Sequence, residues 1–304
     1  MSLSNGCANR LATLLEQIIG KQCSNRSRLG GSESTTLCLD FEIMGPSRKA
    51  ALVTGASAGI GKTFCMQLAD RGYDLIVVAR STDRLEQLKA ELEGRHEITV
   101  EVLTADLTDS LDVQKVAWRL SEPHRPVDLL VNNAGYGLKK RFLDNDVQDE
   151  IAALDILVRT VLVLSHAAAV GGMKDRGHGA IVNVSSVAGF MASGTYSAAK
   201  SYVTVFSESL AGELAGTGVT VTALCPGFTQ TEFHERAGIN HQGTPDFMWL
   251  DADRLVRDCL TDIDKGKVVS VPGLQYKVIT TLLRIAPRPL LRTGKLRSAH
   301  RPQK

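Results

Sequence analysis

Short apolar runs alternate with longer amphipathic stretches along the chain from residue 49 onward. The short runs are rich in Val, Ile, Leu and Ala and are bounded by turn-forming residues, as strands buried on both faces are. We expect strands at 51–54, 75–79, 99–104, 128–132, 180–185, 220–225 and 267–271. Helical stretches lie between them, which predicts an α/β fold: a doubly wound parallel sheet of about seven strands in a single domain.

Two of the predicted helices have features of their own. Asp83 and Glu86 form a capping pair that predicts a helix start at Asp83. The apolar stretch 151–169 predicts a long helix that is buried against the sheet or against a second subunit.

Composition divides the chain into three parts. Residues 1–48 hold half of the cysteines and are rich in Gly, Ser, Asn and Arg, which predicts a disordered N-terminal extension. Residues 49–275 carry the alternating pattern without a linker. Residues 276–304 hold eight Lys/Arg and no Asp/Glu. We expect a solvated basic tail there, and the alternative is a basic amphipathic segment that touches anionic lipid or another subunit.

The overall composition excludes several classes of protein. The 304 residues are 43% hydrophobic and 22% charged, as in ordinary globular proteins, and the net charge of +2 gives no reason to expect nucleic acid as a partner. No run approaches the roughly 18 apolar residues of a membrane span. The six cysteines show neither C-x-x-C pairs nor metal-ligand spacing, which predicts a cytoplasmic protein without a metal centre.

A cluster of glycines separates the first predicted strand from the helix that follows it. The segment 54–61 reads T-G-A-S-A-G-I-G. Glycine lets a ligand approach the backbone closely, and a helix that begins here directs free N–H groups towards one point. This arrangement suits the pyrophosphate of a dinucleotide in a Rossmann-like fold. The spacing differs from G-x-G-x-x-G, so a tight structural turn is the alternative.

Polar residues follow three more predicted strands. Arg80 ends the second strand, where a dinucleotide fold selects between NAD and NADP. An arginine there offers two hydrogen bonds to a 2′-phosphate, which predicts NADP(H) in preference to NAD(H); the alternative is an exposed strand-end arginine. Asp106 follows the third strand and Asn132–Asn133 the fourth. Asp and Asn also favour turns, so neither position alone indicates a site.

Two Y-x-x-x-K patterns compete for an acid–base role. Tyr196 and Lys200 lie four residues apart in a helical stretch and follow Ser186, so phenol, ammonium and hydroxyl can converge on one carbonyl oxygen. A free phenol titrates near ~10, and lowering its pKa to about 7 requires roughly 4 kcal/mol, which we expect Lys200 and an oxidised nicotinamide to supply. Tyr136 and Lys140 sit among glycines, so Tyr136 is either a wall of the substrate cleft or a plain loop residue.

Taken in order, the motifs T-G-A-S-A-G-I-G, A-D-L, N-N-A-G, V-S-S, Y-S-A-A-K and C-P-G-F-T closely resemble those of the short-chain dehydrogenase/reductase family. The resemblance covers residues 49–273. It implies an NADP(H)-dependent oxidoreductase that interconverts a carbonyl and a secondary alcohol on a small or medium organic substrate. It also implies a homo-oligomer.

The resemblance assigns roles to individual residues. The implied catalytic residues are Ser186, Tyr196 and Lys200, with Ser185 as the alternative serine. Asp106 is implied on the adenine side, and residues 226–229 are implied over the nicotinamide. The implied cofactor-binding residues are Thr54, Gly55, Ser57, Gly59, Ile60, Gly61, Arg80, Asp106, Leu107, Asn133, Ala134, Gly135, Tyr196, Lys200, Pro226, Gly227 and Thr229.

Two departures from the family pattern affect the expected chemistry. Only nine residues separate Ser186 from Tyr196, which predicts a more open cleft. Leu157 stands where the family carries an Asn of a proton relay, so we expect turnover to persist at a reduced rate. The rival interpretation is a dinucleotide-binding regulatory or scaffold protein. Residues 231–250 are expected to form a lid over the cleft.

Overall fold

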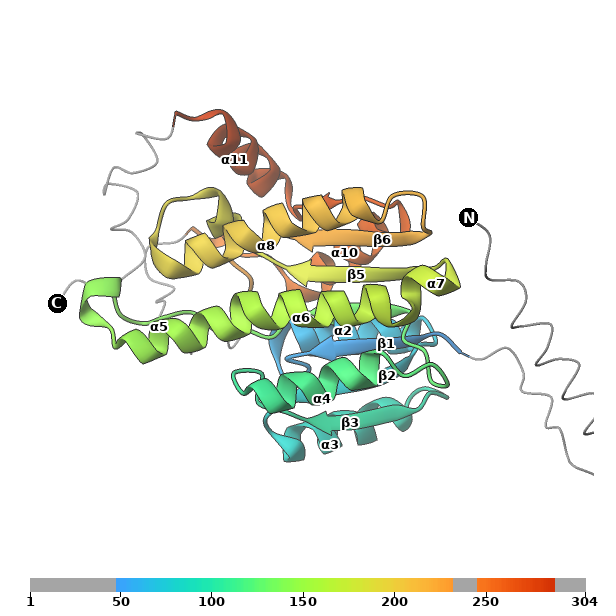
Figure 1. Ribbon diagram of the computed structural model, residues 1–304. Coiled ribbons are helices and arrows are strands. Elements are labelled where there is room, and N and C mark those ends of the chain that lie inside the picture. The colour runs from blue at the N-terminus through green and yellow to red at the C-terminus, as the bar shows by residue number, and fades with distance from the viewer. Residues whose placement is uncertain (1–47, 232–244, 288–304) are drawn as a thin grey trace, which may run out of the picture. The chain divides into compact units, whose positions relative to one another are not determined.

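The computed structural model describes residues 48–231 and 245–287, and these residues belong to one compact unit. Their strands form a single seven-stranded parallel sheet in the order β3-β2-β1-β4-β5-β6-β7 (Figure 1). The strands are β1 (Ala50–Thr54), β2 (Asp74–Ala79), β3 (Val100–Thr104), β4 (Leu129–Asn132), β5 (Gly179–Val184), β6 (Val219–Leu224) and β7 (Val269–Ser270). The predicted doubly wound sheet is confirmed. The seventh strand is shorter than expected, with two residues instead of five.

Helices cover both faces of this sheet because alternate strand residues point to opposite sides. Ala51 and Val53 pack in one apolar core, and Leu52 packs in the other. The first core contains residues of α2 (Gly59–Asp70), α3 (Thr82–Glu93) and α10 (Ala252–Asp264). The second contains residues of α4 (Ser110–Leu120) and α6 (Thr160–Ala168), and α8 (Gly194–Glu213) lies on the same side (Figure 1). Sheet and helices thus form three layers.

The predicted helix at 151–169 is longer than expected and contains two wider turns. It runs through α5 (Val147–Leu154), a π-helical turn (Asp155–Arg159), α6, a second π-helical turn (Ala169–Met173) and α7 (Lys174–Arg176). By length and composition alone, Val147–Arg176 is able to cross a membrane. However, Leu157 and Leu164 are fully buried in the protein. The stretch is therefore a core helix of the α/β unit. Of the two predicted arrangements, burial against the sheet is the one that these leucines show.

Two predicted boundaries differ from the structure. The N-cap of α3 is Ser81 rather than Asp83, whose carboxylate lies in the first turn, where the helix dipole favours a negative charge. Helix α11 (Leu274–Ile285) passes through residue 275, where we expected the domain to end, and Tyr276 within it is buried. The predicted extension 1–48 lies outside the described residues except for Arg48, as do 232–244 of the predicted lid and the tail beyond residue 287.

Candidate active site

The glycine turn between β1 and α2 has no room for side chains. Gly55 and Gly59 have positive φ angles of 67° and 53°, which side chains disfavour. A Cβ on Gly61 would overlap the carbonyl oxygen of Gly55. Ala58, the N-cap of α2, provides no side-chain hydrogen bond, so the first N–H groups of the helix are directed towards a ligand that approaches this turn. The geometry fits a phosphate held by backbone amides.

Hydrogen bonds attach this turn to the end of β4. The Thr54 hydroxyl accepts from the backbone N–H groups of Asn133 and Ala134, at 2.9 Å and 3.0 Å. The Asn133 side-chain amide donates to the carbonyl oxygens of Thr54 at 2.9 Å and of Gly55 at 3.3 Å. β1 and β4 are neighbours at the point where the strand order reverses, which is where open α/β sheets bind ligands. The predicted residues Thr54, Asn133 and Ala134 thus shape the turn.

Asp106 lies at the end of β3 in a bend that its own carboxylate stabilises. Its carboxylate accepts from the backbone N–H of Thr108 at 3.0 Å and from the Thr108 hydroxyl at 2.8 Å. Burial opposes ionisation, but these two bonds and the positive charge of Arg80 outweigh it and lower the pKa of Asp106. Arg80, at the end of β2, is exposed, and among the described residues it has no ion-pair partner within 4.0 Å.

Ser186, Tyr196 and Lys200 come together beyond the end of β5. Ser186 caps a short 3-10 helix (Val187–Phe190) by accepting from the N–H of Ala188 at 3.1 Å. Tyr196 hydrogen-bonds Ser186. Lys200, one turn along α8, places Nζ 5.7 Å from the centre of the Tyr196 ring and donates to the carbonyl oxygen of Val184 at 2.7 Å. The hydroxyl, phenol and ammonium groups predicted from the sequence therefore share one site.

Burial moves the pKa values of Tyr196 and Lys200 in opposite directions. Loss of hydration raises the pKa of Tyr196 to about 12, and the hydrogen bond with Ser186 only partly opposes this. Burial also lowers the pKa of Lys200 to about 8. The expected lowering of the phenol pKa by Lys200 is therefore wrong for the protein alone. The ammonium donates to Val184 and sits against the ring, and desolvation dominates the phenol.

Ser185, the alternative to Ser186, has a structural role. It is buried and donates to the carbonyl oxygen of Lys200 at 2.6 Å, and its hydroxyl shares a second bond with Thr204 at 2.8 Å. Both bonds hold α8 against the end of β5. Because Ser186 instead bonds the Tyr196 phenol, the structure favours Ser186 as the serine of the site.

An apolar cluster lines the other side of the phenol. Leu157 is buried with Ala153 and Ala199, and Tyr136 and Tyr196 pack against this group. The Leu157 Cδ2 atom lies 2.7 Å from the place that a Cβ on Gly135 would occupy. Tyr136 is half-buried, which raises the pKa of its phenol. These contacts favour the interpretation of Tyr136 as a wall of the cleft. Leu157 also places an apolar side chain where the family carries the Asn of a proton relay.

Sequence reasoning missed Tyr276, which fixes the predicted nicotinamide loop. Its phenol donates to the carbonyl oxygen of Met248 at 2.6 Å and accepts from the N–H of Phe228 at 2.9 Å. Its ring fills the space against Gly227, where any Cβ would overlap it. Thr229 is buried in the same loop and pairs with Leu250 in an isolated bridge. The one local signal was Gly227, and that glycine does not identify its partner in α11.

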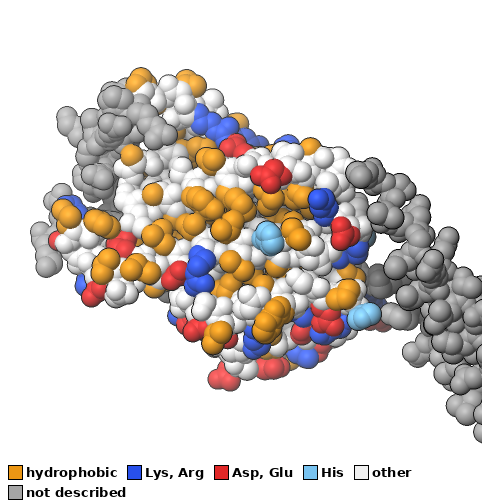
Figure 2. Space-filling model, viewed as in Figure 1, with side chains coloured by type: hydrophobic (Ala, Val, Ile, Leu, Met, Phe, Trp, Pro, Cys, Tyr) orange, Lys and Arg blue, Asp and Glu red, His pale blue; other side chains and the backbone are white. Residues whose placement is uncertain are grey.

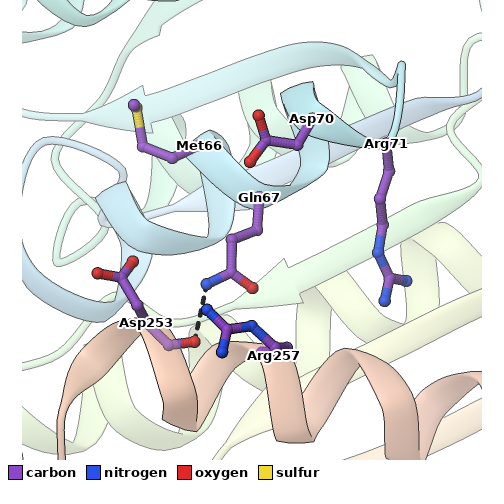
Figure 3. Close-up of a pocket in the computed structure, with 6 residues that line it drawn as sticks. All are labelled: Met66, Gln67, Asp70, Arg71, Asp253 and Arg257. Carbon is purple, nitrogen blue, oxygen red and sulfur yellow. Dashed lines mark hydrogen bonds between the residues drawn. The ribbon is translucent and has the colours of Figure 1, made fainter.

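A surface groove between α2 and α10 is separate from this site (Figure 3). Met66, Gln67, Asp70, Arg71, Asp253 and Arg257 line it, and none of them belongs to the predicted set. The Gln67 amide crosses the groove to the carbonyl oxygen of Asp253 at 2.8 Å. The groove is thus the junction of two packed helices. Among residues 48–231 and 245–287, no cluster of His, Cys, Asp or Glu has the arrangement of a metal site.

A doubly wound sheet with a backbone phosphate cradle beside a Ser–Tyr–Lys group defines a dinucleotide-dependent oxidoreductase. The short chain dehydrogenase family model matches residues 49–241, which is more than half of the chain. The protein therefore belongs to the short-chain dehydrogenase family and is an enzyme that acts on alcohol and carbonyl groups.

Relatives and solved structures agree with this assignment. Sulfoacetaldehyde reductase 2 from Chromohalobacter salexigens is 33% identical over 216 residues, which are 70% of this chain and 85% of the relative. A short-chain dehydrogenase from Sphingobium yanoikuyae in complex with NADPH has a TM-score of 0.71 at 33% identity and covers 79% of this chain and 97% of its own. A bulky-bulky ketone specific alcohol dehydrogenase from Comamonas testosteroni has a TM-score of 0.68 at 29% identity. The match covers 82% of this chain and 98% of the dehydrogenase.

The pKa of Lys200 predicts how stability responds to pH. Between about pH 8 and pH 10.5 the unfolded chain keeps the Lys200 proton that the folded chain loses, so the free energy of unfolding rises with pH. From pH 7 to pH 10 the contribution is about 2 kcal/mol. Urea unfolding of the native chain and of Lys200→Met at both pH values isolates it, because the other titrating groups are common to both proteins. A difference between the two proteins that does not change with pH would contradict the assignment.

Tyr276→Phe tests the positioning role of that phenol. The change leaves the buried N–H of Phe228 and the carbonyl of Met248 without their partner, which costs about 1–3 kcal/mol of unfolding free energy. We expect the Kd for the reduced nicotinamide dinucleotide, measured by fluorescence titration, to rise several-fold as the loop loosens. Tyr73→Phe, a half-buried phenol before β2, is the matched control. Loss of stability with an unchanged Kd would show that Tyr276 is only structural.

Proposed function

We propose that this enzyme is an NADP(H)-dependent oxidoreductase that interconverts a carbonyl and a secondary alcohol on a small or medium organic substrate. The observation that carries the proposal is the meeting of Ser186, Tyr196 and Lys200 at one site beyond β5. A protein that only binds a dinucleotide has no need of a buried acid–base group.

The side chains divide the proton chemistry between them. Bound NADPH supplies the hydride that reduces the carbonyl carbon. Tyr196 carries its proton at neutral pH because its pKa lies at about 12, so it is ready to donate to the carbonyl oxygen. Ser186 orients the phenol through their hydrogen bond, and Lys200 holds a positive charge against the ring. This protonation state is the one that carbonyl reduction requires.

The residues around the glycine turn fit the cofactor. A Cβ on Gly61 would overlap the carbonyl oxygen of Gly55, so glycine there permits the tight turn, and the start of α2 provides backbone N–H groups beside it. Exposed Arg80 lies at the end of β2 and is close enough to Asp106 for its charge to lower the pKa of that carboxylate. An arginine in this position suits a 2′-phosphate, which supports NADPH over NADH. The Sphingobium yanoikuyae structure, a complex with NADPH, is consistent with this preference.

Two further expectations belong to the proposal. Exposed aliphatic side chains on α5, α6 and α8 support a homo-oligomer; they are Ile151, Leu154, Leu162 and Val205. The described cysteines, which are Cys65, Cys225 and Cys259, are free thiols buried in the protein, and this suits the reducing cytoplasm. Light scattering measures the mass of the assembly, and a monomeric mass at micromolar concentration would refute the oligomer.

The rival function is a dinucleotide-binding regulatory or scaffold protein with little turnover. Buried Leu157 favours it, because a leucine cannot bind a relay water. The intact Ser186, Tyr196 and Lys200 group favours the enzyme. A native protein that oxidises no NADPH with any member of a broad panel of ketones and aldehydes would support the rival.

Tyr196→Phe is expected to lower kcat for NADPH-dependent carbonyl reduction by about 10²–10⁴-fold, because it removes the general acid while keeping the ring. The Kd for NADPH is expected to stay within about twofold, since the backbone cradle is unchanged. The decrease in NADPH absorbance measures the rate. Tyr202→Phe, on the same helix, is the control and is expected to keep the native rate. Native-like turnover in Tyr196→Phe would remove Tyr196 from the mechanism.

Arg80→Ala is expected to raise the KM for NADPH by about 10-fold or more and to leave the KM for NADH unchanged, because a hydrogen bond to a charged group contributes about 1.5–3 kcal/mol. Steady-state kinetics with NADPH and with NADH measures the two KM values. Arg95→Ala, at the other end of α3, is the matched control. Equal KM values of the native enzyme for the two cofactors would refute the predicted preference.

A further inference from the structure

Helix α11 contacts the surroundings of the site at both of its ends. In its first turn, the Gln275 amide donates to the carbonyl oxygen of Phe247 at 3.1 Å, next to the bond between the Tyr276 phenol and Met248. In its last turn, Arg284 contacts a different part of the site. The first end therefore holds the predicted nicotinamide loop, and the role of the second end depends on what Arg284 touches.

The guanidinium of Arg284 contacts side chains from two other elements. It lies over the Phe190 ring, 5.0 Å from the ring centre, and 3.9 Å from the carboxylate of Glu208 on α8. Figure 2 shows basic and acidic side chains next to one another on this part of the surface. A planar cation on an aromatic face is an attractive arrangement. Because the Tyr276 phenol fixes α11 to the protein, Arg284 is a firm support for Phe190.

Phe190 is the last residue of the short 3-10 helix Val187–Phe190. Such helices have poor hydrogen-bond geometry, and no residue of this one is fully buried, so its position depends on its neighbours. On α8, the Ser197 hydroxyl donates to the carbonyl oxygen of Ala188. Two elements therefore hold the 3-10 helix, α8 through Ser197 and α11 through Arg284.

The position of this 3-10 helix sets the hydrogen bonds of Ser186. The N–H of Ala188 donates to the Ser186 hydroxyl oxygen at 3.1 Å, and the same hydroxyl bonds the Tyr196 phenol. A hydroxyl that accepts one hydrogen bond becomes a stronger donor in the next. Phe190 and Ala188 belong to the same turn, so a shift of one moves the other. That shift would change how Ser186 presents its hydroxyl to a carbonyl oxygen.

We propose that Arg284 is a positioning residue of the enzyme: it holds Phe190, and through the 3-10 helix it sets the orientation of the Ser186 hydroxyl. Arg284 itself touches none of the reacting groups. This role rests on the proposed function, since the orientation of Ser186 affects turnover only in an oxidoreductase. Only nine residues separate Ser186 from Tyr196, so the segment has little chain of its own with which to fix Phe190.

Arg284→Ala is expected to lower kcat for NADPH-dependent carbonyl reduction by about two- to fivefold, the effect of losing one exposed cation–π contact. The KM for NADPH is expected to stay within about twofold, because the phosphate cradle is unchanged. Arg284→Lys is expected to recover part of kcat, since lysine keeps the charge but lacks the planar group. Lys277→Ala removes another exposed cation of α11 and is the matched control, with native kcat expected.

A double-mutant cycle with Phe190→Leu tests the route from Arg284 to Ser186. If Arg284 acts through the Phe190 ring, Arg284→Ala is expected to cause no further loss of kcat in the Phe190→Leu enzyme. Losses that multiply in the double variant would show that the two residues act independently, and they would overturn the proposal.

Amide hydrogen exchange, measured by mass spectrometry, tests the contact without any substrate. Arg284→Ala is expected to speed exchange at residues 187–191 by about two- to fivefold relative to the native enzyme. Native exchange rates in the variant would overturn the proposal even if no substrate were known. Faster exchange with a native kcat would make Arg284 a structural residue only and would overturn its positioning role. A native enzyme that reduces no carbonyl would instead refute the proposed function, and the role of Arg284 in turnover with it.

Discussion

The site depends on the hydrogen bonds between Thr54 and Asn133. They join the ends of β1 and β4, two strands that are separated by most of the first half of the domain and become neighbours where the strand order reverses. The Asn133 amide satisfies the carbonyl oxygens of Thr54 and Gly55, so the tight turn at Gly55 has its backbone acceptors paired. The turn can then present its N–H groups to a ligand. The phosphate cradle is thus a long-range product of the sheet as well as a local property of its glycines.

A second buried polar network sits under the catalytic side chains. The Asn132 amide donates to the side chains of Ser165 and Asn183, and the Asn183 amide donates to Ser207 on α8. These side chains join β4 and β5 to the helices that carry Leu157 and Tyr196. Burying polar groups is costly unless they are bonded, and of the side-chain atoms in this network Asn132 Oδ1 has no hydrogen-bond partner. The bonds that do form permit fewer arrangements than an apolar contact does. This network therefore fixes how α8 lies on the sheet, and with it the place of the phenol.

The same burial acts on the chemistry in two ways. It raises the pKa of Tyr196 and lowers the pKa of Lys200, because a low dielectric disfavours the charged form of each group. An additional positive charge near Tyr196, such as an oxidised nicotinamide, would favour the phenolate. The protein alone therefore stabilises the form of the acid–base group that donates a proton, and it leaves to the cofactor the charge that the reverse reaction requires.

Sequence patterns predicted those parts of the site whose residues are close together in the chain. The glycine turn and the Tyr196–Lys200 spacing are local, so their geometry follows from one turn and one helix. Tyr276 was missed because it acts on Gly227 and Phe228, about 50 residues away in the chain, and no periodicity reports such a contact. The Ser81 cap and the π-helical turn at Leu157 also depend on packing against neighbouring elements. The nicotinamide loop thus takes its shape from a helix that composition alone assigned to a solvated tail. Helix α11 therefore supports the site through Tyr276.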